Sequence, residues 1–398
     1  MKLLKFEKKD KLIEKRLNKK KVLFTVIILI VILILIIISG IYIANMQFRE
    51  TVDTYILRKN ITENNAALIE VQTEKNPCFA AYDRYIVKIE DNLLTKYSSN
   101  GKVEDEIKLE ISNPIFDSND KCFVVAEKDK QKIYSLSDKE VLWEKDLDGN
   151  ISRVSINKNG YVAVILNGTT YKSIIAVFDR YGKELFRIYL ANTVAIDCAI
   201  SDDNKYVSFA EISTIGTSIQ SNIKTLSIDK AKNRQDAYTF TKNVEDNSLV
   251  VSIKYQEKNN LAILFNDRIE IVKGDQMSTI KNLDTREEKV TFADVNLSNS
   301  VFSIIEKTEK FFSSESTVEI FNTVYNKQNI YLVNSAIKNI YSNENVIAIN
   351  LGTEVHFVST NTGWLIKKFI SKKEIKNIVL SNKIAGIIYH DRIEIIDL

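Results

Sequence analysis

The sequence predicts an all-β protein, a β-propeller that follows one N-terminal transmembrane helix. Three observations support this fold class. An uninterrupted apolar run covers residues 22–44, the hydrophobic period changes to two after Asn64, and a four-stranded unit of roughly 40 residues then recurs to the end of the chain. Eight blades are favoured, and seven is the alternative because the unit beginning at Pro77 is weakly patterned in its first strand.

Composition agrees with a large β-architecture. The chain of 398 residues is rich in Ile, Val, Tyr and Phe, which suit a pleated, half-buried surface. It has only 11 glycines and 2 prolines. Asparagine and aspartate are therefore expected to supply the turns, because they tolerate left-handed backbone and hydrogen-bond locally.

Residues 1–21 form a basic tail with ten Lys or Arg against three acidic residues, and the remainder of the chain is slightly acidic. A basic block can bind nucleic acid. Beside an apolar run, however, it indicates retention on the cytoplasmic side and attraction to anionic lipid. No nucleic-acid partner is predicted.

The apolar run at residues 22–44 predicts a transmembrane helix in contact with the lipid bilayer. As a helix it reaches roughly 35 Å, enough to cross a hydrocarbon core of about 30 Å. A cleaved export signal is the alternative, but the run exceeds the usual 7 to 15 apolar residues and Tyr42 to Ala44 lacks the small-x-small pattern. An uncleaved anchor with the N-terminus in the cytoplasm and residues 45–398 outside is predicted.

Residues 45–64 are predicted to form a helical juxtamembrane stalk. Their apolar residues, among them Phe48, Val52 and Ile56, alternate with charges at roughly helical spacing.

The propeller is predicted to cover residues 65–398. Its clearest unit, Ile151 to Asn192, contains four strands separated by turn residues. Six further units follow the same pattern, at residues 77–111, 112–149, 193–243, 244–289, 290–335 and 336–374. The last unit, residues 375–398, offers only three strands. The strand at Ala66 to Thr73 is available to complete it, which would close the ring and remove an unpaired sheet edge.

The units resemble PQQ-type and WD40-like repeats in the turn and fourth strand of a blade. This resemblance rests on three segments, Asp138 to Leu147, Gly182 to Ile188 and Asn361 to Phe369, with Trp143 and Trp364 near the usual tryptophan. As a whole the chain is similar to an uncharacterised family of single-span bacterial envelope proteins with propeller ectodomains. The resemblance implies the fold alone, because the calcium ligands and catalytic acid of a quinone enzyme have no counterparts here, and no cofactor is predicted.

Three cysteines, Cys78, Cys122 and Cys198, stand among strand-like apolar residues. Core packing is expected for all three. One disulfide among them is an open alternative, with three possible pairings.

No catalytic, cofactor-binding or metal-binding residue is predicted. The two histidines, His356 and His390, both lie in strand-like segments and are expected to be structural. Asp146 to Asn150 faintly resembles the start of a calcium loop but lacks the downstream carboxylate, so a turn is expected.

The predicted function is a non-enzymatic binding or scaffold module of the cell envelope, with an envelope protein or a wall-associated ligand as partner. A propeller hydrolase that uses acidic residues at the central channel is the alternative. Convergence of acidic residues from three or more blades on one end of the channel would favour it. A sensor is disfavoured, because the tail leaves almost nothing inside the cell to carry a signal.

Overall fold

The computed structural model describes residues 19–44, 48–49, 52–57, 59–62, 66–71, 77–119, 121–138, 140–215, 219–244, 248–283, 290–310 and 313–398. The chain divides into two compact units, residues 1–60 and 61–398. Most of the predicted basic tail lies outside the described residues.

In the first unit, helix α1 (Lys19–Ala44) contains the predicted apolar run. Its segment Leu23–Ile43, 21 residues with a mean hydropathy of 3.5, is long and apolar enough to cross a membrane, and its side chains are exposed. Apolar side chains on every face indicate lipid, since a helix on a protein surface has a polar side. A signal sequence would pass the same test of length and composition.

In the described part of the predicted stalk, residues 48–49 are helical, a π-helical turn covers Val52–Ile56, and the short strand β1 covers Asn60–Thr62. The segment therefore differs from the prediction in ending with a strand. Asp53 in the turn is buried, and its carboxylate accepts the Tyr42 hydroxyl at 2.6 Å and pairs with the Lys59 ammonium at 2.9 Å.

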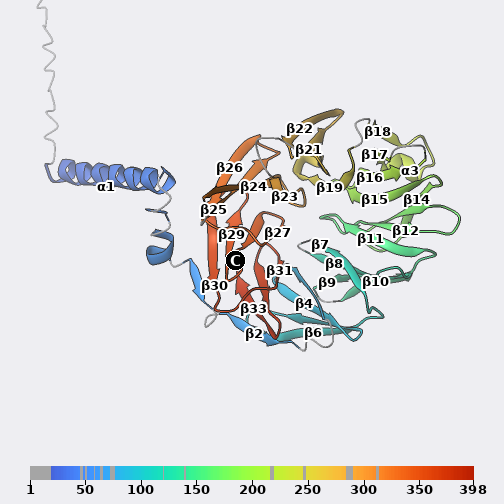
Figure 1. The fold of residues 1–398 in the computed structure, drawn as a ribbon, viewed down its shortest axis with the longest axis horizontal. Coiled ribbons are helices and arrows are strands. Elements are labelled where there is room, and N and C mark those ends of the chain that lie inside the picture. The colour runs from blue at the N-terminus through green and yellow to red at the C-terminus, as the bar shows by residue number, and fades with distance from the viewer. Residues whose placement is uncertain are drawn as a thin grey trace, which may run out of the picture. The chain divides into compact units, whose positions relative to one another are not determined.

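The second unit is a β-propeller of eight four-stranded antiparallel blades, which confirms the favoured count (Figure 1). Within each blade the strands follow one another outward from the centre. The first four blades contain β3 (Cys78–Tyr82), β4 (Tyr85–Glu90), β5 (Leu93–Tyr97) and β6 (Val103–Lys108); β7 (Pro114–Ser118), β8 (Cys122–Glu127), β9 (Lys132–Ser137) and β10 (Val141–Asp146); β11 (Asn150–Ile156), β12 (Val162–Asn167), β13 (Ser173–Phe178) and β14 (Glu184–Leu190); and β15 (Thr193–Ile200), β16 (Tyr206–Ser213), β17 (Gln220–Ser227) and β18 (Tyr238–Asn243).

The other four blades complete the ring, and the seventh carries β1 as a fifth strand beside β30. They contain β19 (Val250–Gln256), β20 (Asn260–Phe265), β21 (Arg268–Lys273) and β22 (Gln276–Asn282); β23 (Val290–Asp294), β24 (Ser300–Lys310), β25 (Ser313–Asn322) and β26 (Lys327–Val333); β27 (Asn339–Asn343), β28 (Val346–Asn350), β29 (Glu354–Ser359) and β30 (Leu365–Ile370); and β31 (Asn377–Leu380), β32 (Ile384–Ile388), β33 (Arg392–Asp397) and β2 (Ala67–Glu70). A short helix, α3 (Ile228–Lys232), and a 3₁₀ turn (Glu257–Asn259) lie in connections.

The middle strands of a blade are apolar on both faces because each blade packs against two neighbours. In the third blade all six residues of β13 are buried, whereas the outermost strand β14 mixes buried and exposed positions. The turns use the predicted residue types, since seven of the ten described non-glycine residues with positive φ are Asn or Asp.

Trp143, the tryptophan noted in the repeat pattern, packs between the second and third blades. Its ring lies 5.9 Å from that of Phe178, centroid to centroid. A Cβ on Gly182, whose φ is +78°, would lie 2.7 Å from the Trp143 ring, so this turn requires glycine for space and for backbone conformation. Trp364 is more exposed, at 37%.

The ring closes as predicted, by pairing the two ends of the propeller. Strand β2 pairs antiparallel with β33, with Ile69 opposite Ile393. Ile69 is buried in a cluster that also holds Ile86 of the first blade. The Ser381 hydroxyl donates to the Asp83 carbonyl at 2.5 Å and so joins the eighth blade to the first. The eighth blade is thus completed to four strands by a segment from the start of the propeller.

Replacing Ile69 by Ala is expected to destabilise the propeller by about 2–5 kcal/mol, because it leaves a cavity at the closing seam. Leu68→Ala on the same strand is the matched control, since Leu68 is 52% exposed, and its effect is expected within about 0.5 kcal/mol. Urea unfolding followed by tryptophan fluorescence measures both. Equal effects would show that β2 does not seal the ring.

Candidate functional site

Three aspartates stand at matching positions near the ends of the innermost strands of alternate blades. They are Asp117 on β7, Asp197 on β15 and Asp294 on β23. In each, Oδ1 accepts the backbone N–H of the next residue, at 2.9, 2.8 and 2.7 Å respectively. Each carboxylate thus fixes its own side chain against its own strand.

The second oxygen of each aspartate reaches the following blade. Asp117 Oδ2 accepts the Ile156 N–H at 2.8 Å, and Asp197 Oδ2 accepts the Ile253 N–H at 2.8 Å. Asp294 Oδ2 accepts the Ser342 hydroxyl. An innermost strand has no further strand on its channel side, so its backbone groups need other partners. The three carboxylates, here called the inter-blade ties, satisfy some of these groups and join blade two to three, four to five and six to seven.

Asp197 is also paired with Arg153, whose Nε lies 2.5 Å from Oδ1. Burial raises the pKa of Asp197, and the Arg153 guanidinium and the N–H groups of Ile253 and Cys198 oppose this rise. The close pairing with Arg153 leaves the Asp197 carboxylate with little capacity for an external ligand.

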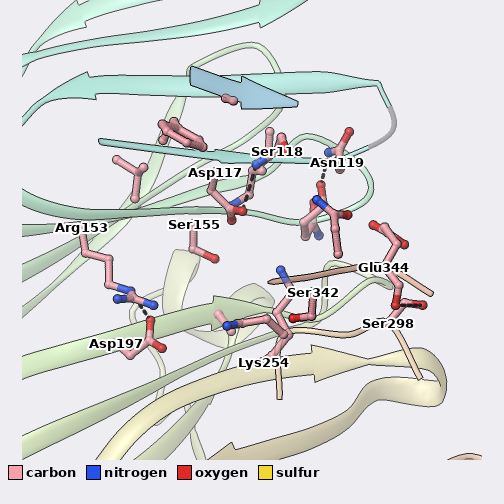
Figure 2. A pocket seen from close by; sticks show the side chains of 18 of the residues that line it. Asp117, Ser118, Asn119, Arg153, Ser155, Asp197, Lys254, Ser298, Ser342 and Glu344 are labelled. Carbon is pink, nitrogen blue, oxygen red and sulfur yellow. Dashed lines mark hydrogen bonds and ion pairs between the residues drawn. The ribbon is translucent and has the colours of Figure 1, made fainter. Parts of the chain in front are cut away.

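A cavity of about 750 Å³ opens at the end of the channel where the innermost strands end, and all eight blades contribute to its lining. Figure 2 shows side chains of part of this lining. Its described charged residues are five acids and three bases, which gives a net negative lining: Asp117, Asp197, Asp202, Asp294, Glu344, Arg153, Lys158 and Lys254. The acids come from four blades. Acidic residues from more than three blades therefore meet at one end of the channel, which is the observation expected to favour a hydrolase.

Lys254 is a half-buried cation on β19 in this cavity (Figure 2). Within the described part of the chain, its ammonium has no hydrogen bond within 3.5 Å and no ion pair within 4.0 Å. The Asp117 carboxylate, followed by Glu344 and Asp197, raises the pKa of Lys254 against the effect of burial. Lys254 therefore stays positively charged at neutral pH.

The two histidines lie apart from the cavity lining. His356 on β29 is bonded on both sides, by the Tyr331 hydroxyl at 2.9 Å from Nδ1 and by the Glu354 carboxylate at Nε2. Burial would raise the pKa of Glu354, but His356 and Lys368 outweigh it, and the pKa is lowered. The expectation of a strand position is wrong for His390, which lies exposed in the turn between β32 and β33, because His390 and Asp391 form that turn.

The three cysteines are free thiols, with Cys198 buried and the other two half-buried. Burial raises the pKa of all three, which keeps them protonated. The turn that resembles a calcium loop has its carboxylates in ion pairs, Asp148 with Arg187 at 2.5 Å and Asp146 with Lys132 at 3.4 Å. Among the described residues no group of three His, Cys, Asp or Glu is arranged to hold a metal ion.

The sequence prediction named no site residue and so missed the inter-blade ties. A signal was present, since Asp117, Asp197 and Asp294 fall in the first strand of three alternate repeat units. Lys254 carries no such signal, because its importance depends on which side chains face it across the channel.

Residues 56–398 match the model of a family of unknown function, DUF5711. The chain belongs to this family. The match covers the propeller, and together with the N-terminal apolar helix it confirms the expected resemblance to an uncharacterised single-helix propeller family. No curated protein matches the sequence.

Solved propeller structures resemble the DUF5711 chain in fold at low identity. Sqt1 of Saccharomyces cerevisiae is 9% identical with a TM-score of 0.55, covering 85% of this chain and 99% of its own. The C-terminal WD40 domain of Sif2 is 11% identical with a TM-score of 0.53, covering 84% and 99%. BamB of Moraxella catarrhalis is 14% identical with a TM-score of 0.46, covering 83% and 100%. The first two support a WD40-like propeller fold.

Replacing Asp117 by Asn is expected to destabilise the propeller by about 1–3 kcal/mol, because the amide keeps one acceptor and turns its NH₂ group toward a backbone N–H. The control is Asp202→Asn, which removes the exposed pair with Lys158 at 3.3 Å; its cost is expected below about 1 kcal/mol. Urea denaturation of both variants gives the comparison. An Asp117→Asn protein as stable as the control would mean that the ties are dispensable.

Proposed function

We propose that this DUF5711 protein is a membrane-anchored, extracytoplasmic binding module of the cell envelope. Helix α1 anchors it, the basic tail stays in the cytoplasm, and the propeller outside presents its channel end to an envelope protein or a wall-associated ligand. The observation that carries the proposal is the cavity of about 750 Å³ to which all eight blades contribute.

The anchored topology rests on two properties of the sequence and the helix. The side chains of α1 between Leu23 and Ile41 are exposed and almost all apolar, and in water such a surface would be strongly unfavourable. Ten Lys or Arg in residues 1–21 favour a cytoplasmic N-terminus.

Binding is favoured over catalysis by the way the channel carboxylates are used. Asp117, Asp197 and Asp294 each accept backbone N–H groups, and Asp197 is also ion-paired. A general acid or base needs a carboxyl group that is free to exchange protons with substrate. The ties instead make the channel end rigid, and a rigid polar cavity suits recognition.

A hydrolase remains the second candidate because acids from four blades do converge on the cavity. Asp202 and Glu344, which are not inter-blade ties, are the carboxylates such an enzyme would use.

The topology predicts which introduced cysteines an impermeant maleimide labels on intact cells. With the native cysteines replaced by Ser, Cys at the exposed Asp275 is expected to react and Cys at Lys2 only after the membrane is permeabilised. Labelling at Lys2 with protection at Asp275 would place the propeller inside the cell and contradict the proposal.

Binding at the channel end is tested by a photo-crosslinking amino acid in the full chain in its membrane. Placed at Asn296, which is exposed and lines the cavity, it is expected to give one discrete product. At Tyr238 on the outermost strand β18, 48% exposed, it is expected to give none.

Two results would reject a binding role at this end. The first is no product from Asn296, or the same product from both positions. The second is turnover of a glycoside or lactone that is lost in both Asp202→Asn and Glu344→Gln, which would replace binding by hydrolysis.

A further inference from the structure

Four polar side chains that line the channel cavity have no hydrogen bond or ion pair within the described structure. They come from four different blades: Ser118, Ser155, Lys254 and Asn343. Figure 2 shows Ser118, Ser155 and Lys254 around the cavity. The carboxylates of the inter-blade ties are already engaged, and so are the ion pairs Arg153–Asp197 and Lys158–Asp202.

The free groups differ from the engaged ones in what they offer a ligand. An ammonium, two hydroxyls and a primary amide together supply several hydrogen-bond donors, and the ammonium has no acceptor capacity. The carboxylates of Asp117 and Asp294 are already occupied by backbone and hydroxyl donors. A matching ligand therefore brings acceptors, and the strongest acceptor for an ammonium is an anionic oxygen.

The charges around Lys254 limit how negative that ligand can be. Five acids face three bases in the lining, and Asp117 and Glu344 act on Lys254 most strongly. Their field opposes any anion, and a dianion about twice as strongly as a monoanion, so a dianionic phosphate is disfavoured relative to a single carboxylate that pairs with Lys254.

The size and walls of the cavity define the rest of the ligand. About 750 Å³ lies within the range of small-molecule sites, roughly 300–1,000 Å³. The hydroxyl and amide groups of Ser118, Ser155 and Asn343 suit a body that carries hydroxyl or amide groups.

We propose that the channel cavity binds a small polar monocarboxylate, with the carboxylate held by the Lys254 ammonium and the Ser155 hydroxyl. The inference rests on the proposed binding function and names its ligand class. A sugar acid and the C-terminus of a short peptide share this chemistry.

The test is calorimetric titration of the full chain in detergent with two matched pairs of probes. One pair is glucuronate and glucose, and the other is acetyl-alanyl-alanine and its amide. The carboxylate member of at least one pair is expected to bind at least about tenfold more tightly than its neutral partner, as expected for a charge-assisted hydrogen bond. The pair that responds identifies the source of the carboxylate.

Variants assign the effect to the cavity. Lys254→Met is expected to abolish the difference within each responding pair, and Ser155→Ala to weaken binding by about tenfold or less. Lys373→Met is the matched control, since Lys373 pairs with Asp391 at 3.1 Å, is 55% exposed and lies outside the cavity lining, and it is expected to bind as the unmodified chain does. Thermal melting of each variant checks that it is folded.

Three outcomes would overturn the ligand class: no saturable binding of either carboxylate, inorganic phosphate binding more tightly than both, or unchanged binding in a folded Lys254→Met protein. Photo-crosslinking from Asn296 is read separately. If a crosslinked product forms and any of these three outcomes is also observed, the proposed monocarboxylate ligand is rejected. The proposed binding function is then still supported.

Discussion

The structure depends on one constraint, that the first and last blades of a ring of twisted sheets must be held together for the ring to close. Strand β2 satisfies it by pairing with β33, so that the eighth blade is built from both ends of the propeller. Closure brings innermost strands from opposite sides of the ring to one channel. The inter-blade ties and the channel cavity exist only because the ring is closed.

The inter-blade ties explain why carboxylates gather in the channel of a protein for which no catalytic motif was found. Innermost strands have backbone groups that face the channel. At alternate blade junctions Asp117 and Asp197 accept such backbone N–H groups, and Asp294 accepts the Ser342 hydroxyl. An acidic cluster that would otherwise indicate glycoside chemistry thus has a structural cause. What remains free in the cavity is a cation and several neutral donors, and this favours recognition of an anionic group.

Apolar residues have two different surroundings in this chain. In α1 they face outward on all sides, as in a helix that could cross a membrane. In strands such as β13 they are buried on both faces because neighbouring blades cover them. The two cases differ in sequence by length and by the turns that follow, since an apolar run of 23 residues cannot be a single strand of a blade.

The sequence alone determined the elements that depend on neighbouring residues: the apolar helix, the alternation of the strands, the Asn and Asp turns, and the strand that completes the last blade. These follow from local periodicity and backbone preference, which act over a few residues. It left the choice between seven and eight blades open, because the first strand near Pro77 is weakly patterned; in the structure this strand is β3, which pairs with β4 in the first blade. It also misplaced His390, where a two-residue turn interrupts a run that alternates on either side.

Only the tertiary structure decided which side chains share the channel. Asp117 and Lys254 are separated by more than three repeat units in the chain, and no local pattern relates them. Their proximity follows from the number of blades and the closure of the ring, which are properties of the whole assembly. For this reason the sequence determined the architecture of the protein, whereas its candidate site could be found only after the ring was formed.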